Sequence, residues 1–271
     1  MRSQKEIALD AKILETLADM ALSGRAAAAA KLIIEDEEVQ AVQEYANTVS
    51  IMRLRYNDHG PVHMRTVALN AAVMMALLRS AGIKTSLEQE ECGLFEDSLI
   101  AVMTAAFLHD IGMSVGRQDH ELHSAYMAYP IIDKILRQVY SGNIQKLATA
   151  RSLALEGISG HMGNRVIHSL EAGIVLIADG CDMTKGRARI PMAIASVPKV
   201  GDIHQYSANS IEEVRLSKGA DHPVRIEVLM SSEVGLFQVE EVLLGKIGAS
   251  PAKTYVELYA LVHGREPKRY L

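Results

Sequence analysis

The sequence is poor in the residues on which several classes of protein depend. Tryptophan is absent, only three phenylalanines are present, and the 271 residues include two cysteines, Cys92 and Cys181. Two cysteines cannot make a disulfide scaffold or a four-thiolate zinc site, so we expect reduced thiols in a cytosolic protein. The scarcity of large aromatic side chains also argues against a platform on which single-stranded nucleic acid would stack.

Positive charge is scarce as well. Lysine and arginine number 28 against 33 aspartates and glutamates, which gives a formal net charge of −5. Non-specific binding of a nucleic-acid polymer needs a broad cationic surface, so no such partner is expected. Apolar residues make up 49% of the chain and charged residues 23%, the balance of a folded protein rather than a disordered one.

No apolar run approaches the roughly 18 residues that cross a bilayer. The stretch at 71–78 is short and lies inside a longer amphipathic pattern. The N-terminal residues MRSQKE alternate in charge and lack the apolar core of a signal peptide. We therefore expect a cytoplasmic protein with no membrane partner.

Proline, which helix interiors exclude, divides the chain in two. Only Pro61 and Pro130 precede residue 190, whereas five prolines follow it. Up to about Met183 the apolar residues recur every three and four positions, which predicts helices. The alanine run at 26–30 indicates a close helix-packing face. The helices are expected at residues 4–22, 35–55, 61–80, 96–110, 119–140, 144–157 and 169–183.

The pattern changes after about residue 200. Apolar residues alternate with others at 224–230 and 256–262, which predicts strands, and a further strand is expected at 211–216. An amphipathic helix is expected at 234–247, with Glu240, Glu241 and Lys246 exposed. The fold class is therefore mainly α, with a helical domain over residues 1–200 and a small α+β module over 201–271. That module could be a ligand sensor, a lid or a dimer interface, and a homodimer is possible because a sheet edge favours self-association.

Seven of the ten histidines lie between positions 59 and 168. The most informative is adjacent to an aspartate: His109-Asp110 ends an apolar helix just before Gly112. A helix that buries Phe107 and Leu108 places this pair at or near the core, where an isolated charge costs several kcal/mol. Taken alone, the pair is explained equally well by a buried histidine that its own neighbour satisfies.

Two other helices also carry ionisable side chains in apolar surroundings. His63 lies in the first turn of the helix at 61–80, and Asp179 ends the apolar stretch at 174–178. One divalent cation with nitrogen and oxygen ligands would explain both residues together with His109 and Asp110. Metal sites in helical bundles are built in this way, from side chains on facing helices.

The order of these residues resembles the HD superfamily of metal-dependent phosphohydrolases. The segment at 63–67 (HMRTV) is similar to the first-histidine helix of that family, 109–112 (HDIG) to its name-giving pair, and 177–182 (IADGCD) to its last-aspartate helix. The resemblance covers about residues 50 to 190. It implies an HD-type helical bundle around a metal site and hydrolysis of a phosphomonoester or phosphodiester.

The two-metal branch of the superfamily, which includes cyclic-nucleotide and cyclic-dinucleotide phosphodiesterases, has extra histidines in two later intervals. His123 and His161 match these best, whereas His120 is expected on a solvated first turn. Asp110 would then bridge the ions. The resemblance implies one or two divalent ions of Mn, Fe, Ni, Co or Zn, since imidazole ligands disfavour Mg alone. In the branch of the superfamily that bears a Gly-Tyr-Pro signature, a lysine often occupies the position of Met113. Assignment of this chain to that branch is therefore not supported.

A cationic loop follows the last aspartate and contains Lys185, Arg187 and Arg189. These side chains are expected to hold phosphate oxygens, although a solvated loop that complements a helix C-terminus is the alternative. Arg65 is a weaker candidate for the same role. Asp182 could either orient a ligand histidine or pair with Lys185.

The function expected from these observations is metal-dependent hydrolysis of a small phosphoester, such as a nucleotide, by a metal-activated water. Asp110 would position the nucleophile, and His59 or His123 could protonate the leaving oxygen. His59 could instead support a ligand or cap its turn. A non-catalytic nucleotide- or metal-binding regulatory protein on the same fold is the alternative function, and a helical scaffold with satisfied core histidines is a third.

Overall fold

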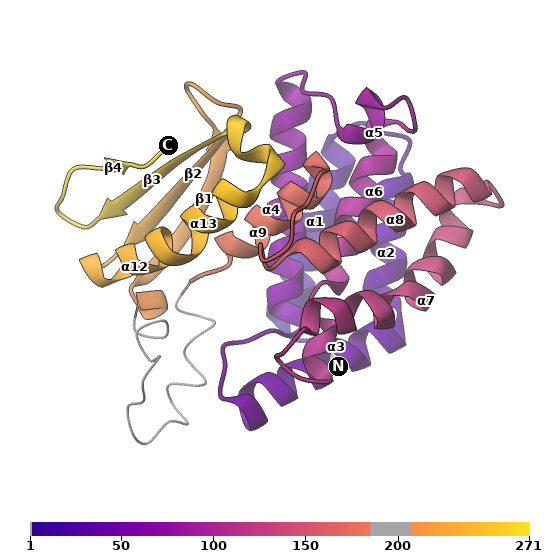
Figure 1. Ribbon diagram of the computed structural model, residues 1–271, viewed down its shortest axis with the longest axis horizontal. Coiled ribbons are helices and arrows are strands. Elements are labelled where there is room, and N and C mark those ends of the chain that lie inside the picture. Colours follow the sequence, from indigo (N-terminus) through magenta and orange to yellow (C-terminus); the bar gives the residue numbers. More distant parts are fainter. Residues whose placement is uncertain (1, 185–206) are drawn as a thin grey trace.

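The structure is a computed structural model that describes residues 2–184 and 207–271. Its larger part is a body of packed helices, and a small sheet with its own helical segment lies beside that body (Figure 1). The helical body contains α1 (Gln4–Asp19), α2 (Arg25–Glu35), α3 (Glu37–Thr48), α4 (Pro61–Ser80), α5 (Ser86–Gln89), α6 (Phe95–Leu108), α7 (His120–Tyr140), α8 (Ile144–Gly160) and α9 (Leu170–Cys181).

Helix α6 lies at the centre of the body. Every residue of α6 from Phe95 to Leu108 is buried, and α2, α4, α8 and α9 all contact it. From Leu99 onward α6 is almost entirely apolar, and such a helix is stable in water only when other helices surround it. The chain therefore emerges from its most buried helix directly into His109 and Asp110, which fixes these two side chains within the interior.

The predicted helices agree closely with the observed ones. Helix α4 has the predicted bounds, with Pro61 at its first position, where the missing N–H costs nothing. The alanine run belongs to α2, and its Ala26, Ala29 and Ala30 are buried, which confirms the packing face. The helix expected at 35–55 is divided, because the π-helical turn η1 (Val49–Leu54) follows α3 and ends at Arg55 with a φ of 60°.

Helix α4 is also long and apolar enough to cross a membrane by length and composition alone. Most of its apolar side chains are buried inside the protein, including Val67, Ala71 and Met74. Packing within the helical body thus accounts for its composition.

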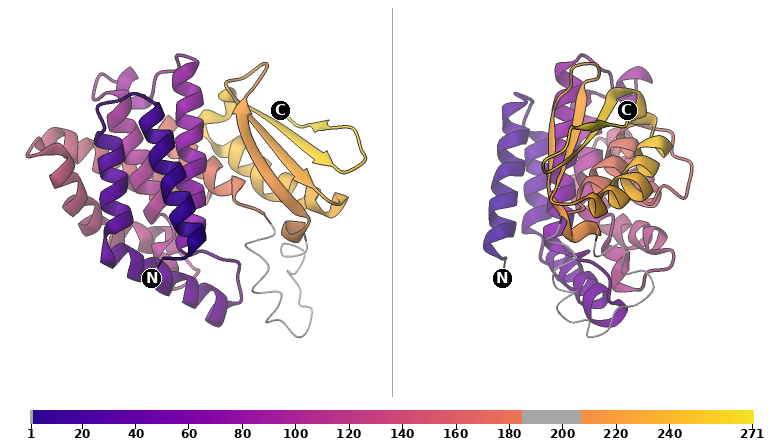
Figure 2. Two further views of the ribbon diagram at one scale, coloured as in Figure 1. Left: turned by 180° about the vertical axis from the view of Figure 1, so that it is seen from behind. Right: turned by 90° about the vertical axis from the view of Figure 1, so that its left-hand side faces the viewer.

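The C-terminal sheet has the strand order β1-β2-β3-β4. Strands β1 (Ile211–Lys218) and β2 (Val224–Met230) form an antiparallel hairpin, β2 and β3 (Val256–Val262) are parallel, and β4 (Lys268–Arg269) pairs antiparallel with β3. Because parallel neighbours need a crossover, a helical segment connects β2 to β3 and lies on one face of the sheet (Figures 1 and 2). The crossover consists of η3 (Glu233–Gly235), α12 (Leu236–Gln238), η4 (Val239–Leu243), α13 (Leu244–Ala249) and η5 (Pro251–Tyr255).

The crossover segment packs directly against α9. A Cβ at Gly173 would lie 2.5 Å from Ser250 Oγ, and one at Gly180 would lie 3.1 Å from both Leu243 Cδ1 and Lys246 Cδ. Residues seven apart share one face of a helix, so the two glycines open a single face of α9 to the C-terminal segment. Buried apolar side chains of the helices and of the sheet form one continuous cluster. The predicted domain boundary at residue 200 lies outside the described residues, and the division into two domains stays a prediction.

Replacing Gly173 tests this close packing. We expect Gly173→Ala to lower the free energy of unfolding by about 1–3 kcal/mol, because the new methyl group meets the Pro251 ring and the Ala252 backbone as well as Ser250. Gly245→Ala is the matched control: it lies in α13 with nothing within 4 Å of its added Cβ, and should stabilise by up to about 1 kcal/mol. Urea unfolding measures the free energy of unfolding of both variants. Equal changes in the two variants would contradict the described packing.

Candidate metal centre

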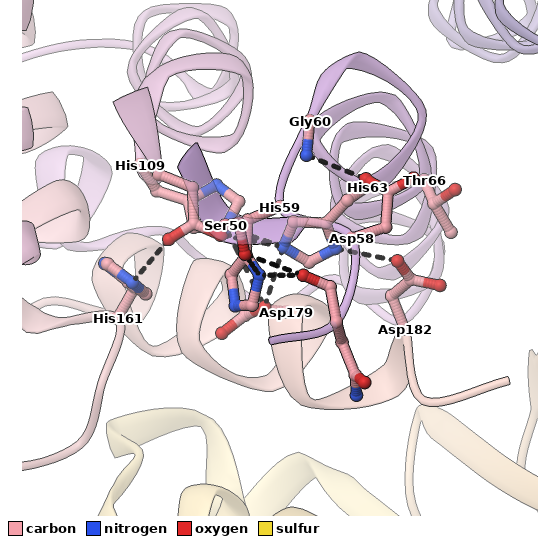
Figure 3. A network of polar contacts seen from close by, with 12 residues as sticks. Ser50, Asp58, His59, Gly60, His63, Thr66, His109, His161, Asp179 and Asp182 are labelled. Atoms are coloured by element: carbon pink, nitrogen blue, oxygen red, sulfur yellow. Dashed lines mark hydrogen bonds and ion pairs between the residues drawn. The ribbon is translucent and has the colours of Figure 1, made fainter. Parts of the chain in front are cut away.

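Six buried or nearly buried ionisable side chains from separate parts of the helical body converge at one place. Figure 3 shows four of them, His63, His109, His161 and Asp179. Three groups among the six have nitrogen and oxygen atoms close enough together to hold a metal ion. The side chains are His63 from α4, His109 and Asp110 from the end of α6, His120 from the first position of α7, His161 directly after α8, and Asp179 from α9.

Gly112 permits this convergence. After α6 the chain turns through Asp110 into the short 3-10 helix η2 (Ile111–Ser114). A Cβ at Gly112 would lie 2.1 Å from the His120 carbonyl oxygen, and the Gly112 N–H donates to Ser124 Oγ at 2.8 Å. Only a residue without a side chain lets the first turn of α7 approach the end of α6 so closely. This approach brings His120 Nε2 to 3.1 Å from Asp110 Oδ1.

All four histidines direct Nδ1 away from the centre, toward an acceptor. The acceptors for His109, His120 and His161 are the backbone carbonyls of Ala106, Arg117 and Ile158, at 2.9, 3.0 and 2.7 Å. The acceptor for His63 is Asp182 Oδ2 at 2.7 Å. Carbonyl and carboxylate oxygens only accept hydrogen bonds, so Nδ1 carries the proton in each neutral ring. The Nε2 atom of each histidine therefore faces the centre and carries no proton when the ring is neutral.

These Nε2 atoms come together in two pairs. His63 and His109 place their Nε2 atoms 3.1 Å apart, and His120 and His161 do the same at 3.1 Å. Two lone pairs at that distance repel unless a proton or a metal ion lies between them. Imidazoles that face one another in this way, each with its Nδ1 bonded to an acceptor, could hold a metal ion between them.

Asp110 lies between the two pairs and presents one oxygen to each. Its Oδ2 is 3.1 Å from His63 Nε2 and 3.4 Å from His109 Nε2. Its Oδ1 is 3.1 and 3.3 Å from the Nε2 atoms of His120 and His161. Among the described residues no donor makes a hydrogen bond of normal geometry to the buried Oδ1. Two donor sets of imidazole nitrogen and carboxylate oxygen thus share one aspartate, and both fit a divalent cation.

Asp179 joins the first of these donor sets. Its Oδ1 lies 3.2 Å from His63 Nε2 and 3.7 Å from His109 Nε2. Its Oδ2 accepts a hydrogen bond from Lys246 Nζ, which also donates to the His161 carbonyl oxygen at 2.9 Å. The prediction that Lys246 is exposed is wrong, because α13 packs on α9 beside Gly180 and its lysine reaches inward.

The charges of the cluster suit metal binding. Burial disfavours ionisation of Asp110, but the charge of protonated His109 and hydrogen bonds from His109, His120 and His161 outweigh it and hold the Asp110 pKa well below its usual range. Burial also opposes protonation of His109, but Asp110 and Asp179 raise the His109 pKa above its usual value, and a metal ion bound here would displace that proton. Burial likewise opposes ionisation of Asp179, but Lys246 and His109 keep its pKa well below the usual value. Burial lowers the pKa of His161 to about 4. At neutral pH the two carboxylates are therefore ionised and His161 is neutral, the forms in which these side chains bind metals.

The structure brings five of the six predicted ligands together and leaves out His123. His123 is half-buried, whereas His120 is buried at 1% exposure and lies beside Asp110, so the expected surface position of His120 is wrong. The helical periodicity of α7 distinguishes His120 from His123. The buried stripe of α7 runs through Ala128 and Ser124, and a further step of four residues back reaches His120.

Arg65 does not face the cluster, contrary to its predicted role in substrate binding. Two residues along a helix rotate a side chain by about 200°, so Arg65 points away from His63 and toward α1 and α3. Its Nε donates to Asp10 Oδ1 at 2.7 Å and its Nη1 to Gln43 Oε1 at 3.2 Å, with 1% of the residue exposed. Arg65 is a buried structural residue that ties three helices together.

His59 lies beside the cluster, as Figure 3 shows. Its ring centroid is 5.8 Å from that of His63, and its Nδ1 is 2.6 Å from the Asn57 carbonyl oxygen and 3.0 Å from Ser50 Oγ. Its predicted catalytic role stays a prediction. Asp182 bonds to His63, in agreement with the first of its two proposed roles. The predicted phosphate-binding residues Lys185, Arg187 and Arg189 lie outside the described residues.

Comparison with known proteins agrees with this geometry. The HD domain family matches residues 62–184, a range that contains all six clustered side chains. The chain belongs to the HD superfamily of metal-dependent phosphohydrolases. The helical fold and the presence of a cluster that could hold a metal follow from this membership as well as from the structure.

A relative extends the similarity beyond the HD domain. The uncharacterized protein MJ1020 of Methanocaldococcus jannaschii is 42% identical over 235 residues, which cover 87% of this chain and 88% of that protein. A match of this length must include part of the C-terminal module as well as residues 62–184. No solved structure is significantly similar to the chain.

The buried position of Arg65 leads to a prediction about stability. We expect Arg65→Met to lower the free energy of unfolding by about 3 kcal/mol, because Asp10 loses a buried partner. Arg137→Met removes an exposed arginine from its pair with Asp133 and should cost less than about 1 kcal/mol. Urea unfolding measures both variants. A large loss of activity or metal with unchanged stability in Arg65→Met would restore a functional role for this residue.

Proposed function

We propose that the protein hydrolyses a phosphomonoester or phosphodiester of a nucleotide or related small molecule, using two divalent cations held by the histidine and aspartate cluster. The observation that carries this proposal is the pair of facing Nε2 contacts on either side of Asp110. Each contact can hold a cation between its two nitrogens, and each has its own oxygen of the same carboxylate.

The residues divide between the two ions by their distances. His63, His109 and Asp179 Oδ1 would hold one ion together with Asp110 Oδ2. His120 and His161 would hold the other together with Asp110 Oδ1. Imidazole-rich sites favour Mn, Fe, Co, Ni or Zn over Mg. His120 therefore replaces His123 in the proposed ligand set.

When bound, such cations lower the pKa of a coordinated water and neutralise charge on phosphate oxygens. The protein itself orients the histidine rings that would bind these cations. The bonds from Nδ1 to carbonyls and to Asp182 hold each ring in one position, and burial of the cluster limits access of bulk water. We assign His59, which lies next to His63 at the edge of the cluster, the role of protonating the leaving oxygen.

Arg117 is the described cation best placed for the substrate phosphate. Its Nη1 is 3.3 Å from Nε2 and 3.5 Å from Nδ1 of His120, so the guanidinium rests against the ring beside the second donor set. Its Cζ is 5.8 Å from the centroid of the half-exposed Tyr56 ring. A guanidinium in this position can grip two oxygens of one phosphate. Lys185, Arg187 and Arg189 stay proposed as further phosphate contacts.

Metal content tests the ligand set. We expect the protein purified and reloaded with Mn²⁺ to contain about two ions per chain. His120→Ala should lower this to about one, because it removes a ligand from one donor set only. His123→Ala, three residues along the same helix, is the control and should leave about two. Equal loss in both variants, or loss in His123→Ala alone, would contradict the assignment of His120.

Hydrolysis is tested with a panel of phosphomonoesters, cyclic nucleotides and cyclic dinucleotides. We expect Mn²⁺-dependent turnover of at least one of them, which Asp110→Asn abolishes. Arg117→Met should reduce kcat/KM about ten- to a hundred-fold at unchanged metal content, since a charge-assisted contact contributes about 1.5–3 kcal/mol. Arg165→Met, which removes an exposed arginine, should have no effect. A protein that binds two ions and turns over none of these compounds would instead be a regulatory binding protein.

A further inference from the structure

We propose that Lys246 is a positioning residue of the metal centre, so that the C-terminal module completes the site in the helical body. The inference rests on the proposed function in one respect, namely that Asp179 holds a metal ion. The observation that carries it is the pair of bonds from Lys246 Nζ, to Asp179 Oδ2 and to the His161 carbonyl oxygen.

These bonds determine how Asp179 is presented. A carboxylate on a single Cβ can rotate and exchange its two oxygens. With Oδ2 bonded to Lys246, Oδ1 is the oxygen that faces the Nε2 atoms of His63 and His109. The lysine side chain is itself 13% exposed and the aspartate 11%, so water competes little for the contact. Lys246 thus selects one oxygen of Asp179 for one ion.

The second bond links the two donor sets. The His161 carbonyl belongs to the residue whose Nε2 faces His120, and its backbone follows directly after α8. One ammonium group therefore joins α9, which carries a ligand of the first set, to the end of α8, which carries a ligand of the second. Both ligand-bearing segments are held by a side chain that belongs to neither.

The packing of the module explains how Lys246 reaches this position. Val239, Leu243 and Ile247 are fully buried and recur every four residues along the crossover segment, which anchors one of its faces. Gly180 lies next to Asp179 and has no side chain to hold α13 away, since a Cβ there would lie 3.1 Å from Lys246 Cδ. The lysine stem therefore runs over Gly180, and its Nζ meets the aspartate one residue earlier in α9.

Metal affinity tests this inference independently of catalysis. We expect Lys246→Met to weaken Mn²⁺ binding about 10- to 100-fold, the usual effect of removing a group that orients a metal ligand. Lys253→Met is the matched control: it makes the same change at an exposed lysine of the same module and should leave the Mn²⁺ affinity unchanged. Isothermal titration with Mn²⁺ on the full-length apoprotein gives both affinities, and circular dichroism checks that each variant is folded.

The outcomes separate a positioning role from a structural one. If Lys246→Met lowers the melting temperature but binds Mn²⁺ as tightly as the wild type, Lys246 only stabilises the fold and the inference is overturned. If that variant does not fold, Lys246→Gln is measured in its place with the same two outcomes. A wild-type protein without phosphoesterase activity would overturn the proposed function, yet weaker Mn²⁺ binding in the variant would still support the role of Lys246.

Discussion

The close approach of imidazole nitrogens on both sides of Asp110 is the constraint on which the rest of the structure depends. Backbone carbonyls hold the Nδ1 protons of three histidines, and Asp182 holds that of His63, so the four Nε2 atoms carry no proton when the rings are neutral. Pairs of these atoms nevertheless lie 3.1 Å apart in the interior. In the proposed function a cation on each side of Asp110 would turn both close contacts into coordination.

Close approach of helices is the means by which the chain builds the cluster. Gly112 lets the first turn of α7 lie against the end of α6, and this contact delivers His120 to Asp110. Gly180 lets the crossover of the sheet module lie against α9, and this contact delivers Lys246 to Asp179. In both places a glycine permits the close approach that brings the polar side chains of the cluster together. The sheet module and the helical body thereby share one hydrophobic core and one polar site.

Much of this could be predicted from residue order, because the helices are long and strongly periodic. His63, His109, Asp110 and Asp179 are conspicuous as ionisable side chains in apolar stretches, and the structure brings them together. Family spacing favours His123 over His120, whereas the phase of the buried stripe of α7 points to His120, which the structure places beside Asp110.

Lys246 and Arg65 show a different limit. A cation on an amphipathic helix is ordinarily solvated, and nothing in the local pattern says that Gly180, far away in sequence, will lie beneath the lysine stem. The position of Arg65 two residues from a metal-site histidine suggests proximity, whereas the helical rotation sends its side chain to Asp10 on another helix. The positions of both side chains depend on tertiary packing, which cannot be predicted from residue spacing within one helix.

The central claim is that one aspartate joins two cation sites, and crystallography of the Mn²⁺-loaded protein tests it most directly. Anomalous scattering from manganese should give two peaks about 3.5–4 Å apart on opposite sides of the Asp110 carboxylate. One peak should be surrounded by His63, His109 and Asp179, and the other by His120 and His161. A single peak with the second pair of imidazoles uncoordinated, or no peak at Asp110, would contradict the account.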